Sequence, residues 1–139
     1  MNCQADIERL AHQKLEAAES LLNDGNPDNA YYIGGYSIEL LLKAKVCKTL
    51  GIDDFFALNK GKKELYKVYK VHNYEELLIL SGLYSIFNEQ LKDLKFKEHW
   101  SIVSTWSEEA RYLTGKTNQE VNDFVTSIKE ICSWIQKHL

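Results

Sequence analysis

The chain has 139 residues, of which 45% are hydrophobic and 27% are charged, and its formal net charge is −3. This composition predicts a single globular domain over residues 1–139 and excludes a disordered chain or one that attracts nucleic acid through its overall charge. The three cysteines lie far apart and form no C-x-x-C pair, which argues against a disulfide framework and a zinc site and favours a reducing compartment.

Sequence motifs for a membrane, a cofactor or a metal are missing. The N-terminus, M-N-C-Q-A-D-I-E, has early acids and no apolar run, so we expect neither a signal peptide nor a membrane anchor and assign a cytoplasmic location. Neither G-x-x-x-x-G-K nor G-x-G-x-x-G is present, and no two histidines stand four residues apart, so no cofactor and no metal site are predicted.

The first part of the chain predicts two antiparallel helices. Apolar residues at helical spacing predict a helix over residues 6–22 with one charged face. A turn cluster at residues 24–27 separates it from a second helix, which Asn26 caps and Gly51 ends. Because the connection is short, the two helices are expected to form a hairpin. Apolar residues cover almost every face of the second helix, so we expect it to be the centre of a bundle.

Two features inside the central helix need an explanation. Gly34 and Gly35 each cost about 1 kcal/mol relative to alanine, so we expect another backbone to approach closely there rather than the helix to bend. Glu39 and Lys43 stand one turn apart among leucines. On a surface they would form an ordinary intrahelical pair, whereas in an enclosed helix both charges need further partners.

Residues 51–71 show a weaker pattern and contain the basic, aromatic stretch of the chain. Ile52 and the phenylalanines that follow it predict one short turn of helix at most. Lys62 and Lys63 belong to a run of lysines that tyrosines interrupt. We expect this run to be a solvated connector. The alternative is an edge that faces phosphate or RNA, where lysines supply charge and tyrosines stack on bases.

Three further helices complete an all-α prediction. Asn73 begins a helix whose apolar stripe continues to Leu94, and a second stripe runs from Trp100 to Leu113. Thr117 opens the last helix with a capping box. No period-two run of apolar residues indicates a strand, so we predict an antiparallel bundle of about five helices.

Arg111 and Tyr112 stand at the end of the predicted fourth helix, with Lys116 and Asn118 just beyond. As a helix C-terminus, this group would only place cations where the helix dipole favours them. As a binding site, it would present an arginine and an aromatic ring to a phosphate-containing ligand.

Several motifs occur in an order that is informative. Residues 21–44 carry the pattern L-L-x-x-G-x(4)-A-Y-Y-x(3)-Y-x-x-E-x-x-L-K-A. His72 is followed closely by E-E-L-L, and Trp106 is followed by Arg111 and Tyr112. Together these motifs resemble the HEPN superfamily of small helical domains, in which similar residues open the third helix and end the fourth. The resemblance covers most of the chain.

The resemblance implies a helical bundle that commonly forms a homodimer. In many members an R-x(4–6)-H motif from each subunit lines a cleft at the dimer interface and cuts RNA without a metal, often in toxin–antitoxin or anti-phage systems. Other members accompany a small nucleotidyltransferase or bind nucleotides. Here Arg111 is present, but no histidine follows it until His138, and Asn118 cannot transfer a proton near neutral pH.

The sequence supports three hypotheses about function. In the first, a homodimer binds RNA or a nucleotide without efficient cleavage. The second is an interaction module that acts with a nucleotidyltransferase or a toxin–antitoxin partner, and the third is a metal-independent ribonuclease that recruits His72 or His99. The binding candidates are Arg111, Tyr112, Asn118, Lys116, Lys62 and Lys63, and the structural polar candidates are Glu39, Lys43 and His72.

Overall fold

The computed structural model describes residues 4–53 and 70–139. Within these ranges the chain forms six α-helices and one 3-10 helix and has no strand, which confirms the all-α prediction. None of these helices is long and apolar enough to span a membrane. The basic stretch with Lys62 and Lys63, and the short helix expected after Ile52, lie outside the described residues. The helices are α1 (Gln4–Asn23), α2 (Pro27–Leu50), α4 (Tyr74–Ser81), α5 (Tyr84–Gln90), α6 (Leu94–Val103), η2 (Glu108–Tyr112) and α7 (Asn118–Lys137).

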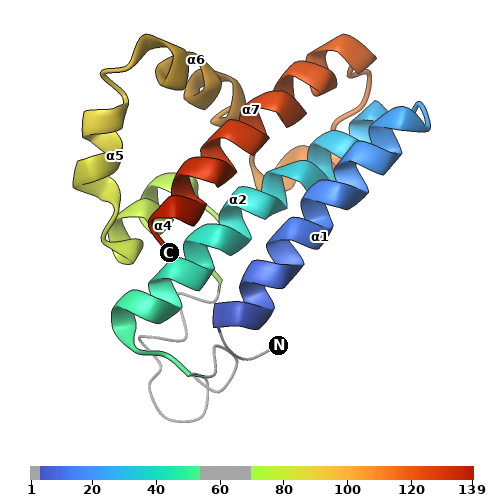
Figure 1. The fold of residues 1–139 in the computed structure, drawn as a ribbon. Coiled ribbons are helices and arrows are strands. Elements are labelled where there is room, and N and C mark those ends of the chain that lie inside the picture. Colours follow the sequence, from blue (N-terminus) through green and yellow to red (C-terminus); the bar gives the residue numbers. More distant parts are fainter. Residues whose placement is uncertain (1–3, 54–69) are drawn as a thin grey trace.

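The helices α1 and α2 form the predicted antiparallel hairpin, and α2 lies at the centre of the fold (Figure 1). Gly25 turns the chain between them with a positive φ of 78°. Asn26 precedes α2, but its side chain accepts a hydrogen bond from the amide of Asn29 and not from a backbone N–H, so the predicted side-chain cap is not formed. Gly51 ends α2 as predicted, in the left-handed conformation.

The last helix, α7, packs on the hairpin and runs in the same direction as α2 (Figure 1). Asp28, at the start of α2, accepts hydrogen bonds from the backbone N–H groups of Gly115 and Lys116, just before α7. Lys48, near the end of α2, donates to the carbonyl of Leu139. The predicted antiparallel arrangement is therefore correct for α1 but wrong for the pair α2 and α7, because α4 to η2 return the chain to the end where α2 begins.

The single helix predicted from Asn73 to Leu94 is wrong, because the chain breaks twice. Asn73 caps α4 as predicted, and its side chain accepts a hydrogen bond of 3.1 Å from the N–H of Glu76. Gly82 then adopts a positive φ of 80° and closes α4. A second break after α5 places Leu94 at the start of α6, which Asp93 caps. Glycine within an apolar stripe is compatible with a helix interior or with a helix end, and here the left-handed conformation ends the helix.

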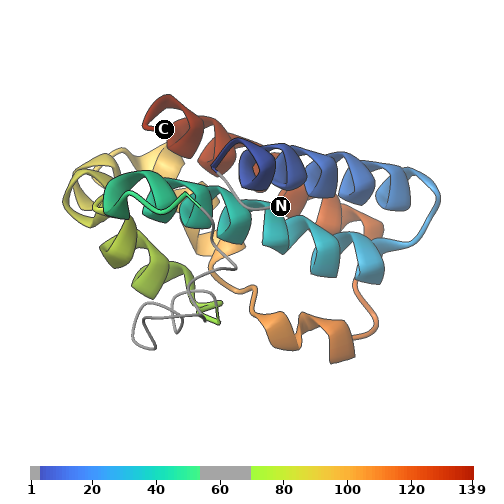
Figure 2. The same cartoon turned by 90° about the horizontal axis from the view of Figure 1, so that it is seen from below.

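The second predicted stripe, residues 100–113, also divides. After α6 ends, Trp106 turns into the core, where it is 5% exposed. Ser107 then caps the short helix η2. Arg111 and Tyr112 therefore lie on a separate 3-10 helix and not at the end of a long fourth helix. Figure 2 shows η2 on the side of α2 opposite α1.

Trp106 explains why α2 needs a glycine at its middle. A Cβ built on Gly35 would stand 2.2 Å from atoms of the Trp106 ring. The indole N–H donates to the carbonyl of Tyr32 at 3.1 Å, and the ring stacks on Tyr74 with 5.5 Å between centroids. The predicted close packing at the glycine pair is confirmed, but the neighbour is a side chain and not a second backbone.

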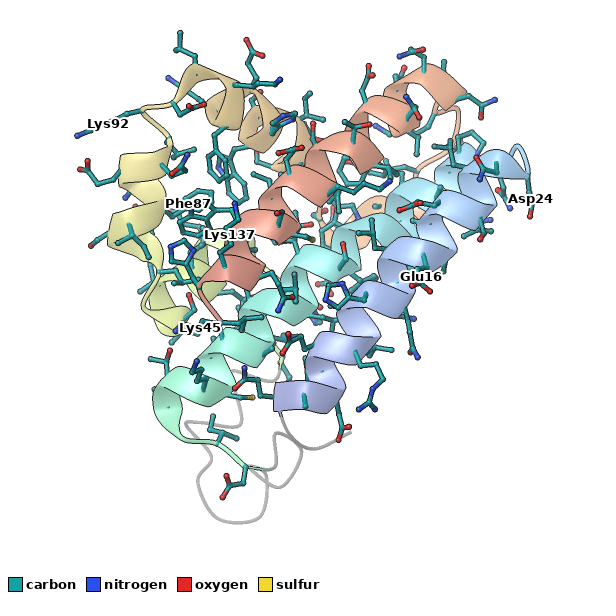
Figure 3. The ribbon with its side chains drawn as sticks, in the orientation of Figure 1. Glu16, Asp24, Lys45, Phe87, Lys92 and Lys137 are labelled. Carbon is teal, nitrogen blue, oxygen red and sulfur yellow. The ribbon has the colours of Figure 1, made fainter. Side chains whose placement is uncertain are left out.

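An aromatic cluster attaches α5 and α6 to α7. Phe87 points from α5 toward α7, whereas Lys92 points outward (Figure 3). The ring centroid of Phe87 lies 4.7 Å from that of Trp100 and 5.4 Å from that of Trp134. Such edge-to-face contacts are favourable beyond the area they bury. The opposite side of α2 packs against α4 and η2, with polar groups between these elements.

Gly34→Ala and Gly35→Ala are adjacent, matched tests of this packing. Alanine at position 35 would collide with Trp106, so we expect a loss of about 3 kcal/mol in the free energy of unfolding. A Cβ at position 34 would meet Ala18 at 3.4 Å and Phe124 at 3.5 Å. Because these are ordinary contacts, Gly34→Ala is expected to be neutral or to stabilise by up to about 1 kcal/mol. Urea denaturation measures both changes, and equal effects would contradict the packing.

Candidate functional site

Glu39 is a buried carboxylate at the middle of α2, and it faces two basic side chains. Its side chain is 3% exposed, and that of Lys43, one turn further along the helix, is 7% exposed. Lys43 Nζ lies 3.5 Å from Glu39 Oε2, and Glu39 Oε1 lies 2.7 Å from Nδ1 of His72. The pair is therefore enclosed, and His72 is the further partner that a buried Glu39 requires.

Burial acts on both charges of the pair. It raises the pKa of Glu39 and lowers the pKa of Lys43, because each charged form loses its contact with water. The opposite charge of the partner works against each shift, and the hydrogen bond from His72 also favours the ionised carboxylate. The two charges thus stabilise each other where either one alone would be penalised.

His72 connects α2 to η2. While Nδ1 faces Glu39, Nε2 lies 3.3 Å from Oε2 of Glu108, the first residue of η2. When the Glu39 carboxylate is ionised it can only accept, and Nδ1 of His72 then donates to it. His72 stands directly before the cap of α4, so three segments that are distant in sequence meet at one imidazole. These two contacts, Glu39–His72–Glu108, are named the His72 bridge below.

A cavity of about 230 Å³ opens beside the His72 bridge. Its lining combines the rings of Tyr74, Trp100 and Trp106 with His72 and the hydroxyl of Ser107. This volume lies below the roughly 300–1,000 Å³ of ordinary ligand sites. The cavity can therefore receive only part of a ligand, such as one planar ring beside the aromatic walls.

Arg111, Tyr112 and Asn118 are exposed and Lys116 is half-buried, and these four residues are named the η2 edge below. The guanidinium carbon of Arg111 lies 4.8 Å from the ring centroid of Tyr112, which is 72% exposed. Lys116 Nζ lies 4.3 Å from the ring of a different residue, Tyr31. Among the described residues Arg111 forms no salt bridge. Asn118 is the exposed first residue of α7.

The His72 bridge and the η2 edge share one short helix. Glu108 begins η2 and Arg111 stands three residues later, which is the spacing at which side chains of a 3-10 helix share a face. Tyr112 chiefly, and Glu108 to a smaller extent, raise the pKa of Arg111. The guanidinium therefore stays charged.

The other candidate nucleophiles and bases are engaged elsewhere. His99 Nδ1 lies 2.9 Å from Oγ of Ser127 on α7. Burial raises the pKa of Cys132 to about 12, which keeps its thiol protonated and unreactive. In the described part of the chain, no three His, Cys, Asp or Glu side chains are grouped as a metal site. His72 is thus the histidine that reaches η2.

Sequence reasoning missed Glu108 and Asp28, for the same reason. Each is an acid in the first turn of a helix, where the helix dipole alone explains it. In the structure Glu108 faces His72, and Asp28 holds the N–H groups of Gly115 and Lys116 at 3.2 Å and 2.8 Å. The position of Glu108 three residues before Arg111 is the one sequence signal that it belongs to the site.

Substitution of Glu39 distinguishes a buried pair from a surface pair. Glu39→Ala removes the carboxylate that faces both Lys43 and His72, so we expect a loss of about 3 kcal/mol in the free energy of unfolding. Glu89→Ala is the matched control, because Glu89 pairs with Lys92 where the side chains are 70% and 74% exposed. Its expected cost is below about 1 kcal/mol. Denaturation at neutral pH compares the two, and similar small losses would overturn the assignment of Glu39 as a buried charge that depends on its partners.

No protein-family model, no curated protein and no solved structure matches this chain. The resemblance to the HEPN superfamily therefore rests on the sequence motifs. The function has to be argued from the charges, rings and contacts of the His72 bridge and the η2 edge.

Proposed function

We propose that this chain binds the phosphate groups of RNA or of a nucleotide at the η2 edge. The observation that carries the proposal is the pairing of Arg111 with Tyr112 on the surface: a guanidinium without a salt bridge among the described residues, 4.8 Å from a ring that is 72% exposed. Arginine recognises phosphate through two parallel hydrogen bonds, and an exposed tyrosine ring offers a stacking surface to a base.

Two neighbours of Arg111 support the same ligand chemistry. Lys116 adds a second positive charge, and the loop that carries it is held by the hydrogen bonds that Asp28 accepts from the N–H groups of residues 115–116. Asn118 opens α7, and the N-terminal end of a long helix favours an anion. The lysines at positions 62 and 63, outside the described residues, remain predicted contributors.

Binding without cleavage is the form of the proposal that the histidines favour. His72 is the histidine near η2, and both of its ring nitrogens already face carboxylates. Its Nε2 could accept a proton from an RNA hydroxyl only after Glu108 had moved away. The alternative of a metal-independent ribonuclease therefore requires a rearrangement at η2, whereas binding to Arg111 requires none.

A second candidate, a protein-interaction module, has one observation in its favour. Tyr112 and the adjacent Leu113 are 72% and 49% exposed. Tyrosine and arginine are enriched at the centres of protein interfaces. The same surface would then meet a second copy of the chain, as the predicted homodimer, or a partner protein such as a nucleotidyltransferase.

Arg111→Ala tests the proposed function against a matched control. Binding is measured at low salt by fluorescence anisotropy with a labelled single-stranded RNA of mixed sequence. Because one phosphate contact is lost, Arg111→Ala is expected to bind with an affinity about tenfold lower and with a smaller salt dependence. Arg9→Ala is the control, since Arg9 is the other arginine of the chain and pairs with Asp6 on α1.

The controls separate the two candidates. Arg9→Ala is expected to bind RNA like the unchanged protein. Equal affinities for all three proteins would refute a phosphate contact at Arg111. If Tyr112→Ala abolished an oligomer in sedimentation experiments while RNA binding was absent throughout, the interaction module would be the correct function.

A further inference from the structure

We infer that the cavity of about 230 Å³ beside the His72 bridge is a subsite for one nucleobase and that Glu75 makes it select guanine. The cavity lies between the start of α4, the end of α6 and the cap of η2, and it is named the α4–α6 cavity below. The inference rests on the proposed function, since it names the base of the nucleotide or RNA whose phosphate Arg111 binds. The base preference and the phosphate contact depend on different residues, so each can fail without the other.

Aromatic rings whose polar atoms are already bonded form the walls of the α4–α6 cavity. Tyr74 and Trp106 are 6% and 5% exposed. The hydroxyl of Tyr74 donates to the carbonyl of Gly35 at 2.7 Å, and the indole N–H of Trp106 donates to the carbonyl of Tyr32. These two rings therefore offer the cavity chiefly carbon surface. Trp100 is half-buried and completes the wall, with its ring centroid 5.8 Å from that of Tyr74. Such a wall favours a planar base over a sugar or a phosphate.

Glu75 is a charged group of the cavity that has no partner. It is exposed, and among the described residues it makes no hydrogen bond or salt bridge. Together with Trp100 it also lines a second cavity, of about 210 Å³, so the two cavities adjoin at these residues. Glu76 occupies the same first turn of α4, where the helix dipole favours an acid, but it lines neither cavity. The dipole explains both acids, whereas the cavity distinguishes Glu75.

Two serine hydroxyls supply further hydrogen-bonding capacity in the cavity. Ser107 Oγ accepts from the N–H of Glu109 at 3.3 Å, so its hydroxyl hydrogen remains to be donated. Ser104 Oγ donates to the carbonyl of Ser101 at 3.3 Å and keeps lone pairs that can accept. The ring nitrogens of His72 already face two carboxylates. The cavity therefore adds one neutral donor and one neutral acceptor to its carboxylate.

Guanine is the base whose Watson–Crick edge fits these groups. Its N1–H and its exocyclic amino group are adjacent donors, so they can bond both oxygens of the Glu75 carboxylate at once. Its O6 stands next to N1 and accepts from a hydroxyl such as that of Ser107. Adenine and cytosine each offer a carboxylate a single amino group, and the N3–H of uracil lies between two carbonyl oxygens that a carboxylate repels. We therefore expect guanine to bind best and uracil to bind worst.

The position of the cavity is compatible with the phosphate contact at the η2 edge. Ser107 lines the cavity, and Arg111 follows four residues later, about 8 Å along a 3-10 helix. A nucleotide spans a distance of this size between its base and its phosphate. The carboxylates of Glu75 and Glu108 disfavour a phosphate in or beside the cavity. The cavity thus takes the base and leaves the phosphate to Arg111.

The affinities for guanosine monophosphate and uridine monophosphate, measured by isothermal titration calorimetry, test the selection directly. Both ligands carry the same ribose and phosphate, so the ratio of their affinities reports the base alone. In the unchanged protein we expect guanosine monophosphate to bind about fivefold to tenfold more tightly. This ratio is the lower part of the range for a bidentate contact to a base, because Glu75 is exposed.

Two neighbouring acids provide the variant and its control. Glu75→Gln keeps the shape of the side chain but turns an amide group toward the donors of guanine, so we expect the ratio to fall to about twofold or less. Glu76→Gln makes the same change of charge in the same helical turn, outside the cavity, and is expected to keep the full ratio. A ratio that persists in Glu75→Gln, or that is lost equally in both variants, would refute the role of Glu75.

Arg111→Ala separates this inference from the proposed function. Equal affinities for the two nucleotides in the unchanged protein refute the base subsite, whatever the effect of Arg111→Ala. If guanine is preferred but Arg111→Ala weakens neither ligand, the subsite stands and the phosphate contact fails. If both nucleotides depend on Arg111 and bind equally well, the reverse holds. If neither nucleotide binds, both proposals fail.

Discussion

The carboxylate of Glu39 has to be satisfied inside an otherwise apolar helix, and its partners determine how one side of the molecule is arranged. Lys43 reaches it along α2, but the closest contact comes from His72, which stands between two distant parts of the chain. Because His72 directly precedes α4 and also faces Glu108, satisfying one buried charge positions the start of α4 and the helix η2 together. The Trp106 ring on Gly35 reinforces the same arrangement from the apolar side, one turn away on α2.

Charge and packing therefore meet on one face of α2, opposite the helix α1. The apolar contacts there are specific, since Trp106 is held by the Tyr32 carbonyl and by the Tyr74 ring. The polar contacts converge on His72, whose two ring nitrogens face Glu39 and Glu108. The helix η2 lies on this face between the buried Trp106 and the loop whose N–H groups bond Asp28. Arg111 and Tyr112 occupy that helix.

Local signals in the sequence predict most of the fold, and long-range contacts account for what they miss. The caps at Asn73 and Thr117 and the stop at Gly51 depend on neighbouring residues, and the structure confirms all three. The continuous helix through Gly82 is wrong, because an apolar stripe is the same whether the glycine stays helical or turns left-handed. For the site, Glu39, Lys43, His72 and Arg111 can be identified from residue type and position. That His72 joins Glu39 to Glu108 cannot, because those contacts span 33 and 36 residues of sequence.

Ligand binding is assigned to the η2 edge, and mapping the surface that responds to RNA tests this assignment most directly. Backbone amide shifts in a heteronuclear NMR titration with a short single-stranded RNA should change in residues 108–118 and next to His72, with little change along α1 and α5. A saturating response centred on α1 or on the outer face of α5, with η2 unaffected, would contradict the assignment of the η2 edge as the binding site. The absence of any response to RNA or to a nucleotide would contradict the proposed ligand chemistry itself.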